Sequence, residues 1–477
     1  MIILVNSKIS HSNIQASLGK PEYSYYFLLT QLKPALEEFA RVIELDSHEA
    51  VDATYRALSA VGETVLFLSA TPPQLTPVDL QCPTVCLFAW EFPDAPDTPW
   101  DGNPRNDWRY ALERLAGAIA CSEESAQAVR NLMGDTYPVT AIPAPVWGHF
   151  GKLMPDGGWR PISQPRPFTF SGTAIDSPVL GLSADGLVQH APRPPRQNHV
   201  SLPKTQKPGP WKQSAQILGS WFNTLRHQQP LAPQPELYNP PPSHAGMEPA
   251  QDCQLELDGV VFCSVLSPKD GRKNWDDIIT AFCWAFRDNP NATLLIKMTY
   301  HDLEFYRILL LTLLSRLAPF KCRVLVLHGF LDAEEYRQLI RVSDFYVNAS
   351  TCEGLCLPLM EFLSAGKPAL APRHTAMLDY IDGDIARVVD TAVELADWSH
   401  DPMGELRSQR HRLNWESLMQ GFRDCYDMAQ DDPDRYQQIS INAGQRMRAF
   451  SDTPVIADQA QRFLTSLRAT PSCGAAR

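Results

Sequence analysis

The sequence lacks the features that mark several large classes of protein. Its 477 residues contain no apolar run long enough to span a bilayer, and the apolar start "MIILV" is too short for a signal-peptide core. Its net charge of −12 argues against a general nucleic-acid binder, which needs basic surface to displace counterions from phosphate. We therefore expect a cytoplasmic protein that binds no nucleic acid, and peripheral contact with the inner face of a membrane stays open.

The signatures of common cofactors and cross-links are also missing. The 11 cysteines are scattered, mostly within apolar stretches, which indicates reduced packing residues and not a disulfide framework. A lone C-x3-C at Cys352 and Cys356 has no second pair to complete a zinc site. No Asp-x-Asp motif lies near a suitable strand, and no strand is followed by the G-x-G-x-x-G of nicotinamide enzymes. We expect neither a metal nor a cofactor.

Composition divides the chain into four segments. Residues 1–150 and 253–430 alternate apolar strand-like runs with stretches of helical spacing, which is typical of parallel sheets covered by helices on both faces. Residues 151–252 hold 18 of the 41 prolines and are predicted to be an insertion or linker. Residues 431–477 are predicted to be a helical tail.

The predicted fold is therefore α/β: two doubly wound, Rossmann-like domains facing a cleft, with a proline-rich insertion between them. Within the insertion, "WKQSAQILGSWFNTLRHQQ" is predicted to form one amphipathic helix. That helix either docks on a domain or lies on a membrane or acceptor, and the sequence leaves both interpretations open. In such sheets, ligands bind beyond the carboxyl ends of the strands, so the strand-to-helix loops are the places to look for chemistry.

One such loop, "NASTCEGLCLPLMEFLSAGKP" at 348–368, places two glutamates around a predicted helix start. Pro358 suits the first turn of a helix and Gly366 its C-terminal cap, so we predict a helix over 358–365. Glu353 then precedes the helix, and Glu361 lies in its first turn. Gly354, followed by Leu355, allows a ligand to approach the backbone closely.

Carboxylates repel phosphate but accept hydrogen bonds from hydroxyls, and the free N–H groups of a helix start favour phosphate. The loop therefore fits a ligand with hydroxyls at both ends and phosphate between them, such as a nucleotide sugar. The alternative is a glutamate placed at a helix start by the helix dipole. That alternative explains Glu361 but not the combination of Glu353, Gly354 and Pro358.

A second loop, "SPKDGRKNW", gathers cations at the carboxyl end of another predicted strand. Arg272 and Lys273 are placed to neutralise a diphosphate and the charge that develops on it as it leaves. A solvated basic turn is the alternative. Lys297, at the end of "ATLLIK", would add a cation, and the backbone at Gly329 and Phe330 would contact a base.

These motifs resemble those of a known family. "EGLCLPLMEFLSAGKP" is similar to the E-x7-E element of the retaining family 4 glycosyltransferases with the GT-B fold, which usually reads E-G-F-G-x-P-x-x-E-A-x-A-x-G-x-P. This sequence has Cys356 where glycine is usual and Phe362 where alanine is usual, and the first change would tighten the sugar pocket. "DGRKNWDDIITAF" resembles the family's basic loop. The resemblance covers about residues 259–390 and is weaker over 1–150.

The resemblance implies roles for particular residues. Glu361 would bind the donor ribose, Glu353 would hold donor-sugar hydroxyls near the reacting carbon, and Gly354 and Leu355 would line the donor site. Arg272 and Lys273 would bind the diphosphate.

On the acceptor side, Trp90 and Glu91 stand where many members carry a histidine. Glu91 either binds a sugar hydroxyl or steers the acceptor, or it only stabilises a turn. The loop after the first strand would add His11 and Asn13.

We therefore predict a retaining, metal-independent hexosyltransferase. It would move a sugar from a nucleotide-diphosphate sugar to a glycan or lipid-linked acceptor, in surface polysaccharide or lipopolysaccharide synthesis by the habit of the family. A catalytically silent sugar-nucleotide-binding subunit and a sugar-nucleotide epimerase on the same two-domain plan are the alternatives.

Overall fold

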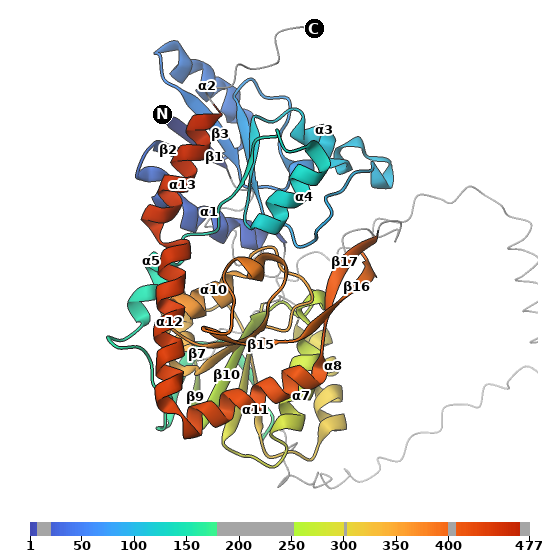
Figure 1. Ribbon diagram of the computed structural model, residues 1–477, viewed down its shortest axis with the longest axis vertical. Coiled ribbons are helices and arrows are strands. Elements are labelled where there is room, and N and C mark those ends of the chain that lie inside the picture. Colours follow the sequence, from blue (N-terminus) through green and yellow to red (C-terminus); the bar gives the residue numbers. More distant parts are fainter. Residues whose placement is uncertain (7–20, 179–251, 300–302, 399–406, 468–477) are drawn as a thin grey trace, which may run out of the picture. The chain divides into compact units, whose positions relative to one another are not determined.

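The computed structural model describes residues 1–6, 21–178, 252–299, 303–398 and 407–467, and the structural statements concern these residues (Figure 1). Three predicted features lie outside them: the amphipathic helix of the proline-rich segment, and His11 and Asn13.

The first sheet contains six parallel strands in the order β2-β1-β3-β4-β5-β6. Alternate residues of β1 face two different cores: Ile3 and Val5 face one, and Ile2 and Leu4 face the other. Both faces are therefore buried, which explains the uninterrupted apolar strands. The strands are β1 (Ile2–Asn6), β2 (Arg41–Glu44), β3 (Val65–Ser69), β4 (Thr84–Phe88), β5 (Gly117–Ala120) and β6 (Val139–Ala141).

Helices follow the strands of this sheet as the spacing predicts. They are α1 (Pro21–Glu37), α2 (Val51–Ala60), α3 (Trp108–Leu112), α4 (Glu123–Met133) and the short α5 (Trp147–Phe150). Ser122 caps α4, because its hydroxyl accepts a hydrogen bond from the backbone N–H of Ser125.

The second sheet has seven strands in the order β15-β14-β13-β10-β11-β12-β8. From β10 the chain runs outward through β11 and β12, and then returns to add β13, β14 and β15 on the other side. The strand order therefore reverses between β10 and β13, the place where such sheets bind ligands. The parallel strands are β10 (Val260–Leu266), β11 (Ala292–Met298), β12 (Arg323–His328), β13 (Phe345–Val347), β14 (Ala369–Pro372) and β15 (Ala386–Val389).

The helices of this half also match the predicted alternation. They are α7 (Trp275–Ala285), α8 (Leu303–Leu317), α9 (Ala333–Val342), α10 (Leu357–Ser364) and α11 (Trp415–Asp431). Asp332 and Glu335 form a capping box at the start of α9. Together the two sheets form two doubly wound, Rossmann-like domains, as predicted.

The first part of the predicted proline-rich segment is integrated into the fold. The strand β7 (Arg166–Ser171) pairs with β9 (Asp252–Leu257), and β8 (Thr173–Asp176) adds an antiparallel edge strand to β12. Two of its residues are tied to the sheet by ion pairs: Asp176 to Arg323, and Arg166 to the buried Asp344.

The C-terminal part differs from the predicted pattern in one feature and matches it in another. An antiparallel hairpin, which was not predicted, forms from β16 (Thr391–Asp397) and β17 (Arg407–Leu413). The predicted tail contains two helices, α12 (Pro433–Ser451) and α13 (Thr453–Ser466). The second of these packs against α1 and shares its apolar core, so the tail returns to the first domain.

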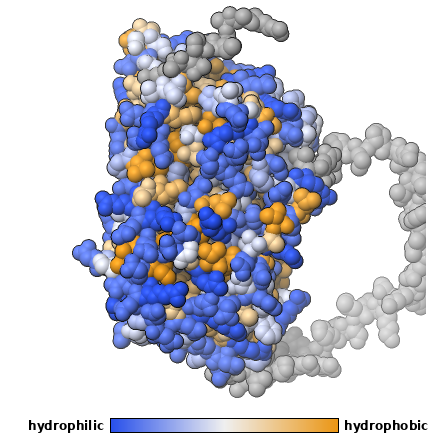
Figure 2. All heavy atoms as spheres, viewed as in Figure 1, coloured by the Kyte–Doolittle hydropathy of each residue, from blue (hydrophilic) through white to orange (hydrophobic). Residues whose placement is uncertain are grey.

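The face of the protein in Figure 2 is mostly hydrophilic, because most apolar residues of the strands lie in the cores. Hydrophobic residues form patches between the hydrophilic ones on this face. No helix among the described residues is both long and apolar enough to span a membrane.

Candidate donor site at the switch point of the second sheet

The two loops singled out in the sequence meet at the strand-order reversal. One follows β10 and contains a single helical turn, Gly271–Lys273; the other follows β13 and leads into α10. Because β10 and β13 are parallel neighbours, their following loops emerge at the same edge. The backbone N–H of Thr351 donates to the carbonyl of Arg272 at 2.8 Å, which joins the two loops directly.

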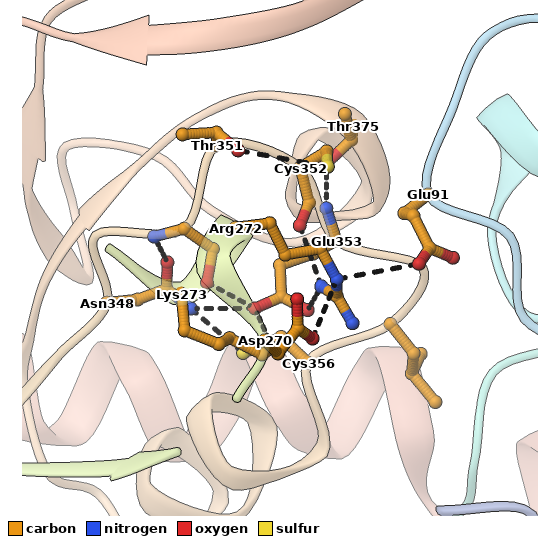
Figure 3. Close-up of polar contacts among 12 residues, drawn as sticks. Glu91, Asp270, Arg272, Lys273, Asn348, Thr351, Cys352, Glu353, Cys356 and Thr375 are labelled. Carbon is orange, nitrogen blue, oxygen red and sulfur yellow. Dashed lines mark hydrogen bonds and ion pairs between the residues drawn. The ribbon is translucent and has the colours of Figure 1, made fainter. Parts of the chain in front are cut away.

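Glu353 is the centre of a charged cluster (Figure 3). Its carboxylate is 2.5 Å from Lys273 Nζ and 3.0 Å from Arg272 Nη1. It also accepts hydrogen bonds from Ser350 Oγ at 2.6 Å and Asn348 Nδ2 at 3.3 Å. The side chain of Glu353 is almost wholly buried. Arg272 and Lys273, which were predicted to bind the diphosphate, are thus held by the carboxylate that was expected to bind sugar hydroxyls.

Two further acids contact Arg272. The Nε of Arg272 is 3.4 Å from a carboxylate oxygen of Glu91 and 3.0 Å from one of Asp270 (Figure 3). Glu91 follows β4 of the first sheet. This acid was predicted to lie on the acceptor side, and it contacts Arg272, which was predicted to bind the donor. The cluster combines two cations with three carboxylates, and an incoming diphosphate would have to share the cations with those carboxylates.

These contacts change the pKa values of Glu353 and Arg272. Burial on its own raises the pKa of Glu353, but Lys273 and Arg272 outweigh burial and hold the pKa well below its usual range. Burial on its own lowers the pKa of Arg272, and Glu91 and Glu353 outweigh it and raise the pKa. Both groups are therefore charged at neutral pH. Glu353 can act as a hydrogen-bond acceptor and a negative charge, but not as a proton donor.

A steric reason for glycine at 354 comes from the protein itself. A Cβ atom at Gly354 would lie 2.9 Å from the backbone nitrogen of Trp90 and 3.1 Å from Ala89 Cβ. The chain after β4 thus approaches Gly354 closely, and the approach of a ligand stays a prediction. The adjacent Leu355 is buried, and its carbonyl accepts a hydrogen bond from Tyr380.

Cys356 occupies the turn into α10 in a left-handed conformation, with φ of 64°. Only glycine adopts the left-handed conformation without strain, which explains why the E-x7-E element that this loop resembles usually has glycine here. The Cys356 sulfur accepts a hydrogen bond from Asn348 Nδ2 at 3.0 Å, and Asn348 also contacts Glu353. The thiol is buried, and burial raises its pKa to about 12, so it is not a reactive thiolate.

The helix that contains Glu361 begins one residue earlier than predicted, so Glu361 falls just beyond its first turn. The helix α10 begins at Leu357, with Pro358 in its first turn, and Glu361 belongs to the second turn. Its carboxylate accepts hydrogen bonds from Tyr336 Oη at 2.6 Å and from Gln31 Nε2 at 3.2 Å. Burial raises the pKa of Glu361, and these two neutral donors offset the effect of burial only in part.

The remaining predicted residues occupy packed positions. Lys297 is buried, its Nζ donates to the carbonyl of Met298, and burial lowers its pKa to about 8. A Cβ at Gly329 would lie 2.9 Å from the Ser171 carbonyl oxygen, and Phe330 is half-buried beside it. The Trp90 ring is buried and packs against Trp108, with ring centroids 4.6 Å apart, which favours a structural role.

A buried histidine supports the Glu353 loop and was not found from the sequence. Burial and the stacked His411 lower the pKa of His374 to about 3, so its ring is neutral. The contact of Nε2 with the Ser350 carbonyl then assigns the proton to Nε2, and Nδ1 accepts from the Thr375 hydroxyl. The Thr375 hydroxyl accepts in turn from the backbone N–H of Glu353. Nothing in the sequence signals this chain of contacts.

The described residues contain no group of three or more His, Cys, Asp or Glu side chains arranged to hold a metal ion. Metal independence stays a prediction.

Comparison with known proteins identifies the architecture. No protein family and no curated protein matches the sequence. Among solved structures, HepE from Anabaena, crystallised with UDP, is similar over 98% of this chain and 99% of that chain, at 14% identity and a TM-score of 0.51. The sucrose-phosphate synthase from Thermosynechococcus elongatus is similar over the same shares of the two chains, at 13% identity and a TM-score of 0.53. Both are GT-B glycosyltransferases. The chain has the GT-B fold. At these identities the likeness extends to the fold and no further.

Proposed function

We propose that the protein is a glycosyltransferase that moves a sugar from a nucleotide-diphosphate sugar to a glycan or lipid-linked acceptor. The observation that carries the proposal is the cluster of Arg272, Lys273 and Glu353 at the strand-order reversal of the second sheet. This edge is where doubly wound sheets bind nucleotides. The UDP bound to HepE makes UDP-sugars the first donors to test.

In the proposed reaction, the bond between the anomeric carbon and the diphosphate oxygen breaks, and the acceptor oxygen bonds to that carbon. The acceptor proton passes to the departing diphosphate. Arg272 and Lys273 stabilise the negative charge that develops on the leaving group. Glu353 keeps these cations in place, and its ionised carboxylate faces the positive charge of an oxocarbenium-like transition state.

The finer features of the proposal rest on the resemblance to family 4. They are retention of configuration at the anomeric carbon, hexosyl transfer, and work without a metal or a cofactor. Glu361 would bind the ribose, Glu91 would lie beside the acceptor, and surface polysaccharide or lipopolysaccharide synthesis on the inner face of a membrane would be the setting. Support for the site comes from the contact of Glu91 with Arg272 and the burial of Glu361 next to neutral donors.

A panel assay tests the proposal. UDP-, GDP- and ADP-sugars are incubated with the protein and candidate glycan or lipid acceptors in EDTA, and nucleotide release and product anomers are measured. We expect one donor to release nucleotide in the presence of an acceptor, and Lys273→Met to slow the release by about 100-fold. If no nucleotide sugar is bound or consumed, the proposal fails. Binding without turnover favours the silent subunit, and conversion of the donor sugar without an acceptor favours the epimerase.

A further inference from the structure

Gln31 of α1 combines a paired donor with an unpaired acceptor beside the candidate ribose site. Its side chain is 8% exposed, and its Nε2 donates to Glu361 Oε1 at 3.2 Å. The other atom of the same amide, Oε1, is buried and has no hydrogen-bond partner in the described part of the chain. A buried carbonyl oxygen without a donor is unfavourable, and its presence calls for a physical reason.

The orientation of this amide follows from its neighbour. A carboxylate only accepts hydrogen bonds, so the nitrogen of Gln31 faces Glu361 and the oxygen must point elsewhere. The second oxygen of Glu361 accepts from Tyr336 Oη at 2.6 Å. If Gln31 served only to link α1 to α10, the hydrogen bond from its nitrogen to Glu361 would be sufficient for that role. The orphan oxygen therefore indicates a missing donor next to Glu361.

A ribose supplies donors with this spacing. Its 2′ and 3′ hydroxyls are on adjacent carbons, so a diol can donate one hydrogen bond to Glu361 and the other to Gln31 Oε1. Each carboxylate oxygen accepts more than one hydrogen bond, so the contacts from Gln31 and Tyr336 leave Glu361 able to accept one from a hydroxyl.

We propose that Gln31 is a donor-binding residue, and that its side-chain oxygen accepts a hydrogen bond from one ribose hydroxyl of the nucleotide while Glu361 accepts from the other. This rests on the proposed function, since it needs a nucleotide at Glu361. It adds a nucleotide contact from a helix of the first sheet, 330 residues from Glu361 in the chain.

The test compares ribonucleotides with their deoxy forms. Dissociation constants of UDP, GDP and ADP, and of their 2′-deoxy and 3′-deoxy forms, are measured by calorimetry for the wild type and for Gln31→Met. We expect the wild type to bind its preferred ribonucleotide about 10-fold more tightly than one of the two deoxy forms. Gln31→Met should bind the ribonucleotide about 10-fold more weakly, and should bind that deoxy form as the wild type does.

Gln459→Met is the matched control. The side-chain oxygen of Gln459, in α13, is also buried without a partner among the described residues, but Gln459 does not contact Glu361. This variant should bind all nucleotides as the wild type does. Should Gln31→Met fail to fold, Gln31→Asn, which withdraws the amide by one methylene, is measured in the same way.

The outcomes separate the two proposals. If the wild type binds no nucleotide, the proposed function and this inference both fail. If the wild type binds a nucleotide and Glu361→Gln weakens it, but Gln31→Met weakens the ribo and deoxy forms equally or neither of them, the inference alone is overturned. A loss confined to the nucleotide that carries one particular hydroxyl supports it.

Discussion

Glu353 and Glu361 are eight residues apart and lie in opposite electrostatic surroundings. Glu353 contacts two cations, and its pKa is held well below the usual range. Among the described residues, Glu361 forms hydrogen bonds only with an amide and a phenol, and burial raises its pKa. The same side chain is thus a fixed negative charge at one end of the loop, and a hydrogen-bond acceptor with a raised pKa at the other.

The difference teaches how one loop can serve a ligand with two kinds of group. A fixed charge keeps cations in place for a diphosphate, whereas an acceptor among neutral donors suits the hydroxyls of a sugar ring. The loop is therefore divided by chemistry, and each end can be changed separately from the other.

The largest effect is expected at the charged end. Glu353→Ala leaves Arg272 and Lys273 without their shared carboxylate, so we expect the free energy of unfolding to fall by about 3 kcal/mol and transferase activity to be lost. Chemical denaturation and the panel assay measure the two effects. Glu334→Ala is the control, because Glu334 also contacts two arginines, but at the surface. Equal stability of the two variants would contradict the central role of Glu353.

The cations should affect catalysis more than stability. Lys273→Met removes one of the two groups that would stabilise the leaving diphosphate, so we expect kcat to fall by about 100-fold, with a change in melting temperature of only a few degrees. Lys33→Met, which removes a surface lysine paired with Glu44, should change neither quantity. An active Lys273→Met would mean that the charged end does not bind the diphosphate.

The pH dependence of stability should have opposite signs at the two glutamates. The native pKa of Glu361 lies above the ordinary 4.5. Between these two values, native Glu361 retains a proton that the unfolded chain has released. Its contribution to stability is present below pH 4.5 and is lost as the pH rises through the native pKa. The native pKa of Glu353 lies below 4.5, so its contribution is present above pH 4.5 and is lost as the pH falls.

Thermal unfolding of Glu361→Gln and Glu353→Gln between pH 3 and pH 8 would check these signs. The first variant should lose the decline of stability above about pH 4.5, and the second should lose the decline on acidification. If the stability of the two variants depended on pH in the same way, the two glutamates would not lie in opposite electrostatic surroundings.

The smallest effect is expected at the turn between the two ends. Cys356 has a left-handed backbone, so Cys356→Gly should be about 1 kcal/mol more stable than Cys356→Ala, because both lack the thiol and only alanine keeps the strain. Denaturant titration of the two variants measures the difference. If alanine is as stable as glycine, the turn is not strained.

The main features of the fold, and the two loops that contribute the charged cluster, could be predicted from the sequence. Continuous apolar strands and helix signals are local, and a reversal of strand order necessarily brings the loops after β10 and β13 together. The ion pair of Lys273 with Glu353 was not predicted, because the topology brings the loops together but does not fix which side chains meet. The start of α10 at Leu357 follows closely from Pro358.

Contacts between distant segments could not be predicted. Gln31 lies in an otherwise ordinary apolar helix, and only the folded chain brings it to Glu361. The strand β17 reads "RSQRHRL", a polar stretch with almost no apolar alternation, so its pairing with β16 had no local signal. Nor did the sequence indicate that the chain at residues 89 and 90 packs closely against Gly354.

The return of the last helix to the first domain affects any attempt to divide the protein. The core under α1 includes Ile456, Ala460 and Leu464 of α13, and a Cβ at Gly117 would lie 3.1 Å from Leu467. A fragment cut at residue 150 would leave this apolar surface bare and prone to aggregation. Separate production of the two halves would instead need residues 453–467 grafted onto the first half or supplied as a peptide, which makes this helix a natural site for a split-protein reporter.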